Sequence, residues 1–547
     1  MRTAQTLSQA LTLTAAVTVA LALVTGGTDL EAREPSVPAP EPAAGPLLAL
    51  LERPDAAAGP GPQAAAVREA LERFYRAGGY RPSWFDERGR PIARVEALLE
   101  ALESADRDGL RPGDYRPDLL ARELRRLAPE ADPAALHRAD LLLSTAFARL
   151  VHDLAAGRVD PDDAGAQWFL GSRRPDLAAA LHQAVYGDGG VETTLAALRP
   201  AHPGYQRLRQ ALERYREIVG AGGWPAVPEG PVLSAGNRAD AARLAALAAR
   251  LAAEGDLDRT APAGRGTYDE TLAAAVRRFQ ERLGLEADGA VGPATLAALN
   301  VPARERLRQL ELNLERWRWV PAELPARRVE IDLPAFRLRL VEDGRTVSAM
   351  KVVVGKRGSR TPIFRDSLTQ VVLNPYWNVP PGIAARELRP KGSAYLAARG
   401  YETVAGGGLR QRPGPGNSLG RVKFVLDNQQ LIYLHDTPEK HLFGRAERAF
   451  SHGCIRLERP LELAEWALRD HPEWSSERLR AAVARGRHDW IPLPREIPVY
   501  VLYFTTWAED DGRVHFRRDL YGFDDSLAQA LERRYPEPST VLLAAGS

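Results

Sequence analysis

The chain has 547 residues, of which 45% are hydrophobic and 26% are charged, and its 73 basic and 71 acidic side chains leave a net charge of +2. This length predicts about three to four domains. The near-balance of charge argues against a protein that binds nucleic acid mainly through electrostatics. No apolar run reaches the roughly 18 to 20 residues of a membrane-spanning helix, which excludes a polytopic membrane protein.

The chain has a single cysteine, Cys454. A disulfide framework within the chain is therefore impossible, and so is a zinc or iron–sulfur site with several thiolate ligands. A lone cysteine is either a small buried hydrophobic residue or a nucleophile. The residues around Cys454 must distinguish these two hypotheses.

The amino terminus has the pattern of a targeting segment. Arg2 precedes an apolar stretch, Ala10–Val24, and small residues follow it, which predicts a signal peptide over residues 1–27. An uncleaved anchor is the alternative, and the absence of a cysteine after the apolar stretch excludes a bacterial lipoprotein. Residues 28–65 are rich in Pro, Ala, Gly and Glu and predict a disordered linker. The sequence therefore predicts an exported protein.

Residues 66–225 have a helical pattern. Apolar residues recur at helical spacing in Ala66–Ala77, Val95–Leu102 and Ala139–Ala155. This region contains no cluster of catalytic side chains, and we expect an α-helical scaffold domain.

Residues 230–303 predict a small unit of three helices, at Asn237–Glu254, Tyr268–Leu283 and Ala294–Leu299. Gly289 suits a turn with positive φ, and Pro293 suits the first turn of a helix. The stretch "AVRRFQERLGLEADGAVGPATLAALN" resembles the peptidoglycan-binding domain of type 1. This resemblance implies binding to the peptidoglycan sacculus. A three-helix bundle that does not bind glycan is the alternative.

Residues 304–547 change to a β pattern. The stretch "RRVEIDLPAFRLRLVEDGRTVSAMKVVVG" alternates apolar and polar residues, with Asp343-Gly344 as a hairpin turn. We expect a mostly β domain, so that the whole chain is a multi-domain α+β protein. Its further elements are predicted strands at Leu368–Leu373, Val422–Leu426, Leu431–Leu434 and Val499–Thr505, and a helix at Pro460–Arg469. An irregular Gly- and Pro-rich insertion, 383–420, is expected to form a mobile cap over a cleft.

The stretch "YLHDTPEKHLFGRAERAFSHGCIRLERP" holds three histidines and the cysteine. Catalysis by a thiol needs a thiolate, a base that takes its proton and donors for the oxyanion. His435 and His452 are both candidate bases for Cys454, and His452 could instead shape the loop. Gly453 lets backbone amides approach a substrate carbonyl. Arg456 could hold a substrate carboxylate or stabilise the thiolate.

Ser451-His452-Gly453-Cys454, preceded by His435, resembles the signature of the YkuD-type L,D-transpeptidases of peptidoglycan. The stretches "VVVGKRGSRTPIF", "VVLNPYWNVPPGI", "NSLGRVKF" and "IYLHDTP" extend the resemblance. The resemblance implies that Cys454 is the nucleophile and His435 the general acid and base, oriented by the backbone carbonyl of Asp436. It implies a structural or substrate-facing role for His452. The residues expected to bind substrate are Tyr433, Trp377, Asn378, Ser451 and Arg456.

The resemblance implies a periplasmic, wall-associated enzyme that makes 3–3 cross-links between stem peptides through a thioester on Cys454. It implies no metal or organic cofactor, no nucleic-acid partner and no membrane contact beyond the signal segment. Carbapenems are expected to be covalent inhibitors. The alternative acceptors are water, giving an L,D-carboxypeptidase, and a lipoprotein lysine. An alternative of a different class is a peptidoglycan-binding protein without catalysis.

Two further hypotheses concern the histidines and the cysteine. A zinc site made of His435, His441, His452 and Cys454 is conceivable by ligand type, although the set has no helical i, i+4 pair. A papain-like hydrolase would place its cysteine before its histidine in the chain, which is the reverse of the order here.

Overall fold

The computed structural model describes residues 46–52, 63–127, 133–165, 168–171, 173–260, 266–427 and 430–533. The predicted signal peptide and most of the predicted linker lie outside these ranges. Within the linker, however, helix α1 spans Pro46–Leu51 and α2 already begins at Ala64. The linker prediction is wrong there, because Leu47 and Leu51 lie on one helical face and are buried in the core of the helical region.

The helical region follows the predicted pattern. Its helices are α2 (Ala64–Ala77), α3 (Arg94–Glu103), α4 (Pro117–Arg126), α5 (Pro133–Ala156), α6 (Leu177–Tyr186), α7 (Gly190–Leu198) and α8 (Pro203–Gly220). Helix α5 begins at Pro133, earlier than expected, and is buried along most of its length. Leu143, Phe147 and Leu154 of α5 belong to the core that this region shares with α1. In the described part of the chain, no helix is long and apolar enough to cross a membrane.

The three-helix unit consists of α9 (Ala241–Ala253), α10 (Glu270–Leu283) and α11 (Pro293–Leu299). The first helix begins at Ala241, and the prediction of a start at Asn237 is wrong. Residues 237–240 stay extended because Asn237 accepts a backbone hydrogen bond from Tyr268 at 2.8 Å and Arg238 pairs with Thr267.

The turn before α11 is held by the buried amide of Gln280. Its Oε1 accepts from the backbone N–H of Gly289 at 2.8 Å, and its Nε2 donates to Asp288 Oδ1 at 2.8 Å. Gly289 has φ of 75°, as its place in the predicted turn requires.

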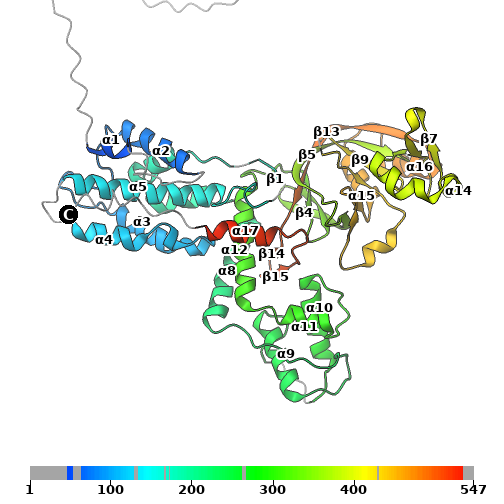
Figure 1. The fold of residues 1–547 in the computed structure, drawn as a ribbon, viewed down its shortest axis with the longest axis horizontal. Coiled ribbons are helices and arrows are strands. Elements are labelled where there is room, and N and C mark those ends of the chain that lie inside the picture. The colour runs from blue at the N-terminus through cyan, green and yellow to red at the C-terminus, as the bar shows by residue number, and fades with distance from the viewer. Residues whose placement is uncertain are drawn as a thin grey trace, which may run out of the picture. The chain divides into compact units, whose positions relative to one another are not determined.

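The region with the predicted β pattern, residues 304–547, contains a closed β barrel (Figure 1). Its strand order is β5-β13-β2-β3-β4-β12-β10-β9, and β9 pairs again with β5 to close the sheet. The strands are β2 (Arg328–Asp332), β3 (Arg337–Glu342), β4 (Arg345–Gly355), β5 (Ile363–Leu373), β9 (Val422–Leu426), β10 (Leu434–His435), β12 (Ile455–Leu457) and β13 (Asp489–Leu502). Asp343 and Gly344 have φ of 47° and 76° and form the expected hairpin turn.

A strand and several helices outside the barrel connect it to the preceding domains through strand pairing and side-chain packing. Strand β1 (Trp168–Phe169), from the helical region, pairs with the start of β5. Helix α12 (Ala303–Trp319) packs against α8, against α17 (Phe523–Glu532) and against β14 (Thr506–Ala508), which pairs with β15 (Val514–Phe516). One hydrophobic core contains Tyr205 of α8, Phe279 of α10 and Val329 of β2. The barrel, the three-helix unit and α8 therefore share one core, whereas helices α1–α7 pack around a core of their own.

The insertion at 383–420 has regular structure, and the prediction of an irregular loop is wrong. Helix α13 (Pro381–Ile383) leads into it, and it contains a π-helical turn at Ala384–Leu388 and α14 (Ser393–Ala398). A three-stranded sheet joins β6 (Trp377–Asn378), β8 (Leu409–Gln411) and β7 (Tyr401–Thr403). Val379, Leu388 and Leu409 form a small core beneath it. The glycines at 406 and 407, with φ of 82° and 78°, make the turn between β7 and β8.

Candidate active site

Three charged or titratable side chains lie in one row across the barrel. His435 on β10 pairs directly with Lys423 on β9 and with Arg456 on β12. Directly paired residues of neighbouring strands point to the same face of a sheet. The row therefore brings two cations beside His435. Lys423 was missed in the sequence because its position depends on the pairing of β9 with β10, although the residue lies within the quoted stretch "NSLGRVKF".

Cys454 lies at the end of the loop between β11 (Ala449–Ser451) and β12. Gly453 has φ of 120°, a conformation that residues with a Cβ rarely adopt. The buried Ser451 hydroxyl donates to the carbonyl of Cys454 at 2.6 Å and accepts from the N–H of Gly453 at 3.1 Å. Ser451, which is 2% exposed, thus holds the loop that carries the thiol.

A second set of hydrogen bonds supports this loop from below. Thr361 Oγ1 donates to the carbonyl of Gly453 at 2.7 Å and accepts from the N–H of Gly355 at 2.9 Å. The hydroxyl of Tyr521 donates to the Gly355 carbonyl at 2.8 Å and accepts from the Thr361 N–H at 3.2 Å. Neither Thr361 nor Tyr521 was predicted from the sequence, and the only signal for Thr361 was its place in "VVVGKRGSRTPIF".

The thiol of Cys454 receives two hydrogen bonds from Tyr433, one from its backbone N–H and one from its hydroxyl. Burial raises the pKa of Cys454, and the bonds from Tyr433 together with the charges of Lys423 and Arg456 oppose that rise. The ammonium of Lys423 lies 4.1 Å from the centre of the Tyr433 ring. Trp377 hydrogen bonds to Tyr433, which connects the cap insertion to the thiol.

His435 is buried, and its Nδ1 lies 2.5 Å from the carbonyl oxygen of Asp436. This is the orienting contact that the resemblance implies. With Nδ1–H donating to the carbonyl, Nε2 is the nitrogen that can accept a proton. The Asp436 carboxylate is occupied elsewhere, by the Arg421 N–H at 2.8 Å and by Lys440 Nζ at 2.7 Å.

Burial lowers the pKa of His435 to about 3, and the nearby charges of Arg456 and Lys423 act in the same direction. The imidazole is therefore neutral at neutral pH. Burial raises the pKa of the Cys454 thiol, so the resting residue is a neutral thiol and not a thiolate. The resting pair is thus thiol and imidazole, and a thiolate requires transfer of a proton.

The remaining predicted residues lie around this centre. His452 is exposed, and its Nε2 lies 2.7 Å from Glu387 Oε1 in the cap insertion. Arg456 forms an ion pair with Glu439. Asn378 is exposed on β6, where its backbone pairs with Arg410. His441 lies in a 3-10 turn, as expected of a loop residue. Among the described residues, no group of three or more His, Cys, Asp or Glu side chains could hold a metal ion.

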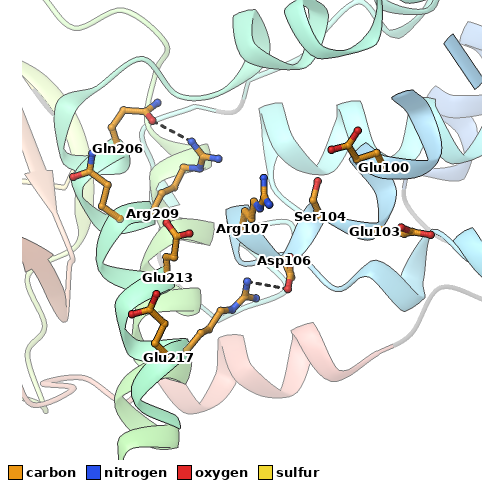
Figure 2. Close-up of a pocket in the computed structure, with 11 residues that line it drawn as sticks. Glu100, Glu103, Ser104, Asp106, Arg107, Gln206, Arg209, Glu213 and Glu217 are labelled. Carbon is orange, nitrogen blue, oxygen red and sulfur yellow. Dashed lines mark hydrogen bonds and ion pairs between the residues drawn. The ribbon is translucent and has the colours of Figure 1, made fainter. Parts of the chain in front are cut away.

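A separate cleft lies in the helical region (Figure 2). It has a volume of about 630 Å³, and all its lining residues lie within 100–107 and 206–217. Arg216 pairs with Asp106 at 3.0 Å within this cleft, an interaction drawn as a dashed line in Figure 2. This cleft therefore belongs to the scaffold and not to the centre around Cys454.

Sequence comparisons match three parts of the chain to known families. Residues 326–485 match the YkuD family, described as "L,D-transpeptidase catalytic domain". Residues 69–212 match a "Scaffold domain", and residues 241–299 match a "Putative peptidoglycan binding domain". Cys454, His435 and the whole cap insertion fall inside the first match.

A protein of Haemophilus influenzae described as "Putative L,D-transpeptidase" is 30% identical over 241 residues, which are 40% of this chain and 48% of the relative. The chain thus spans about half the length of the curated relative it matches. The solved L,D-transpeptidase of Stackebrandtia nassauensis is 16% identical with a TM-score of 0.21, covering 51% of this chain and 96% of that one. That of Xylanimonas cellulosilytica is 19% identical with a TM-score of 0.17, covering 50% and 98%. The family matches rather than these structures identify the domains: this chain carries a YkuD L,D-transpeptidase catalytic domain, preceded by a scaffold domain and a peptidoglycan-binding domain of type 1.

Proposed function

We propose that the protein is a cysteine L,D-transpeptidase that joins peptidoglycan stem peptides by 3–3 cross-links. The observation that carries this proposal is the arrangement around Cys454. The thiol receives two hydrogen bonds from Tyr433, and a neutral imidazole oriented by the Asp436 carbonyl lies on the adjacent strand. These groups supply the nucleophile, the donors and the base that acyl transfer needs.

In the proposed reaction, Sγ of Cys454 attacks the carbonyl between the third residue of a stem tetrapeptide and its terminal D-Ala. Nε2 of His435 takes the thiol proton as the carbon–sulfur bond forms. The carbon–nitrogen bond then breaks, and D-Ala leaves with the proton from His435. The side-chain amine of a second stem attacks the thioester, its proton passes to His435, and the thiol is regenerated when Cys454 recovers that proton.

Charge near the thiol favours the anionic stages of this reaction. Negative charge develops first on sulfur and then on the attacked carbonyl oxygen. Lys423 and Arg456 lie in the same row as His435 and lower the pKa of Cys454 against the effect of burial. Preorganised donors and cations in a partly buried site stabilise such charge because they need little reorganisation.

An amine acceptor is favoured over water by the cap insertion. Its Glu387 contacts His452, two residues from the nucleophile, and Trp377 of β6, the strand that pairs with β8 of the cap, contacts Tyr433. A folded cover over the thioester excludes water and so disfavours an L,D-carboxypeptidase. A lipoprotein lysine as acceptor uses the same acyl-enzyme. A purely wall-binding role gives no reason for the two hydrogen bonds aimed at the thiol. Export to the periplasm and association with the wall follow from the peptidoglycan-binding domain and the proposed substrate.

The test is incubation of the purified protein with sacculi that contain tetrapeptide stems, followed by mass spectrometry of the released muropeptides. We expect 3–3 linked dimers and free D-Ala. Release of D-Ala with only tripeptide monomers would assign the carboxypeptidase reaction instead. No D-Ala from a folded protein would overturn the proposal.

A further inference from the structure

Three aromatic rings lie together on the protein surface beside the cap, and we call Tyr376, His488 and Trp490 the aromatic ledge. Trp490 is 58% exposed and Tyr376 is 37% exposed. The rings of Tyr376 and His488 are 5.2 Å apart and nearly perpendicular, and those of His488 and Trp490 are 6.1 Å apart. Exposed tryptophans are costly to leave in water, so a cluster of this kind indicates a binding surface.

The ledge is fixed by hydrogen bonds before any ligand binds. Trp490 Nε1–H donates to His488 Nε2 at 2.9 Å, so His488 carries its proton on Nδ1, which lies 2.9 Å from the Asn374 carbonyl. Asn374 is buried in a left-handed conformation, with φ of 45°, and its Nδ2 donates to the carbonyl of Arg487 at 2.9 Å. A strained residue held by several bonds indicates that the position of these rings is specified.

The cap side of the ledge is equally ordered. The guanidinium of Arg410 lies 4.5 Å over the Tyr376 ring and is held by an ion pair with Glu402 at 2.5 Å. Arginine and glutamate at the rim supply hydrogen-bond partners next to the aromatic faces. The surface therefore combines apolar ring faces with polar groups.

The ledge lies on the same face of the barrel as the catalytic centre. Trp490 pairs with Val372, Val372 with Lys423, and Lys423 with His435. Val371 and Leu373 belong to the barrel core, so the row through Val372 lies on the outer face. Three steps between strands at about 4.8 Å each place Trp490 roughly 14 Å from His435 along this row.

We propose that the aromatic ledge is a subsite for the glycan strand of peptidoglycan. The C–H faces of sugar rings stack on aromatic rings, whose faces carry partial negative charge. Hydroxyl and acetamido groups of the glycan would bond to the polar rim. A stem peptide that reaches the thiol is attached to such a strand, and the ledge lies on the face from which the stem would approach. This inference rests on the proposed function and assigns a second contact to the same substrate.

The first experiment measures binding without chemistry. Glycan strands stripped of their stem peptides are titrated into the protein, and binding is followed by intrinsic fluorescence and by sedimentation. We expect binding that Trp490→Ala weakens about tenfold and that Trp490→Phe largely retains. Val347→Ala is the matched control, since Val347 is also 51% exposed and lies on β4. Equal binding by the protein and by Trp490→Ala would overturn the inference.

The second experiment compares two substrates. The ratio of turnover on sacculi to turnover on free tetrapeptide is expected to fall about tenfold in Trp490→Ala and in Tyr376→Ala, and to stay constant in Val347→Ala. An unchanged ratio in both ledge variants would overturn the inference. Loss of self-association or of binding to anionic phospholipid vesicles in Trp490→Ala, with glycan binding intact, would assign the ledge to another partner and also overturn it.

The two proposals fail in different ways. If the unaltered protein releases no D-Ala from free tetrapeptide, the transpeptidase proposal is wrong, whatever the ledge binds. If it releases D-Ala but the stripped glycan strands do not bind, the transpeptidase proposal stands and the ledge inference is wrong.

Discussion

Two buried polar clusters in this protein handle charge in opposite ways. Near the peptidoglycan-binding unit, Arg282 contacts Glu254 at 2.9 Å and Asp256 at 2.6 Å, and Arg250 contacts Glu254 at 2.7 Å. Burial alone would raise the pKa of Glu254, but Arg282 and Arg250 outweigh it and hold the pKa well below its usual range. Around Cys454, burial dominates, and both the thiol and His435 rest in their neutral forms.

The difference distinguishes a structural cluster from the proposed reactive one. A fully paired ionic cluster is fixed in one charge state and gains nothing by moving a proton. A neutral thiol beside a neutral base can move a proton, because the ion pair that results is stabilised by neighbouring donors only after the transfer. The clusters therefore predict different outcomes when one member is removed.

The largest expected effect is on the reactive cluster. Cys454→Ala should abolish acylation by a carbapenem such as imipenem and leave the thermal midpoint unchanged, since one atom is lost. Cys454→Ser should be nearly inactive, because a hydroxyl is a much poorer nucleophile at neutral pH. Intact-protein mass spectrometry measures the adduct. A full adduct on Cys454→Ala would place the nucleophile elsewhere.

Substitution of each histidine, measured by the same acylation assay, tests which of the two is the base. His435→Ala should slow acylation by about 100-fold or more, within the range of a general base. His452→Ala should slow it much less, because His452 contacts Glu387 and is exposed. Equal defects in both variants would show that the base has been misassigned.

Removing a member of the cluster around Arg282 should lower the free energy of unfolding and leave the acylation rate unchanged. Arg282→Met leaves Asp256 buried without its arginine and Glu254 with Arg250 alone, and breaking a buried pair in this way typically costs about 3–5 kcal/mol of unfolding free energy. Arg277→Met, which removes an exposed pair with Glu270, should cost about 1 kcal/mol or less. Urea unfolding followed by circular dichroism measures both. A cost for Arg282→Met no larger than that of its control would contradict the comparison.

Removing the hydrogen bonds that hold the loop before Cys454 is expected to slow acylation by an intermediate amount. Thr361→Val removes the bonds to the Gly453 carbonyl and from the Gly355 N–H. A net loss of about 1–1.5 kcal/mol in positioning corresponds to roughly a tenfold slower acylation. Thr369→Val is the control, because the Thr369 hydroxyl donates to the Val425 carbonyl of β9 at 3.3 Å and not to the loop that carries Cys454. The two rates should differ clearly, and equal rates would remove Thr361 from the positioning residues.

A smaller effect is expected at the cap. Glu387→Ala breaks the contact with His452 and should raise the ratio of hydrolysed to cross-linked product by about two- to threefold, because water reaches the thioester more readily. Quantitative muropeptide analysis gives the ratio. Arg389→Ala, at a cap residue that contacts the Gly407 carbonyl rather than His452, is the matched variant and should change it less.

The rate of acylation by a carbapenem should not change near pH 6.5, where a histidine base with an ordinary pKa would titrate. With the pKa of His435 at about 3 and that of Cys454 raised, the neutral pair prevails over neutral pH. The acylation rate should be flat between about pH 5 and 8 and should fall only as His435 is protonated at more acidic pH. A step near 6.5, the ordinary pKa of histidine, would show that the imidazole is not as buried as the structure has it.

Local patterns were enough to predict much of this molecule. The amphipathic helices and the hairpin at Asp343-Gly344 follow from short-range spacing. The spacing left both His435 and His452 as candidate bases for Cys454, and the choice of His435 came from the family resemblance. Lys423 could not be predicted from such patterns, because only the register between β9 and β10 places it beside His435. The cap was misread since its strands are two or three residues long and its turn glycines look like those of a loop. Arg282 gave no signal, because its partners are distant in the chain.

Closure of the barrel affects whether copies of the protein can associate through unpaired strand edges. Strand β10 is only two residues long, yet it has a hydrogen-bonded neighbour on each side, and β9 returns to β5. Where β9 ends, β1 takes over the free side of β5. Unpaired strand edges are the usual template for strand addition and fibril growth. In this barrel the strands around His435 are paired on both sides, so the face that carries the proposed catalytic centre can meet a polymeric substrate without also exposing an unpaired strand edge.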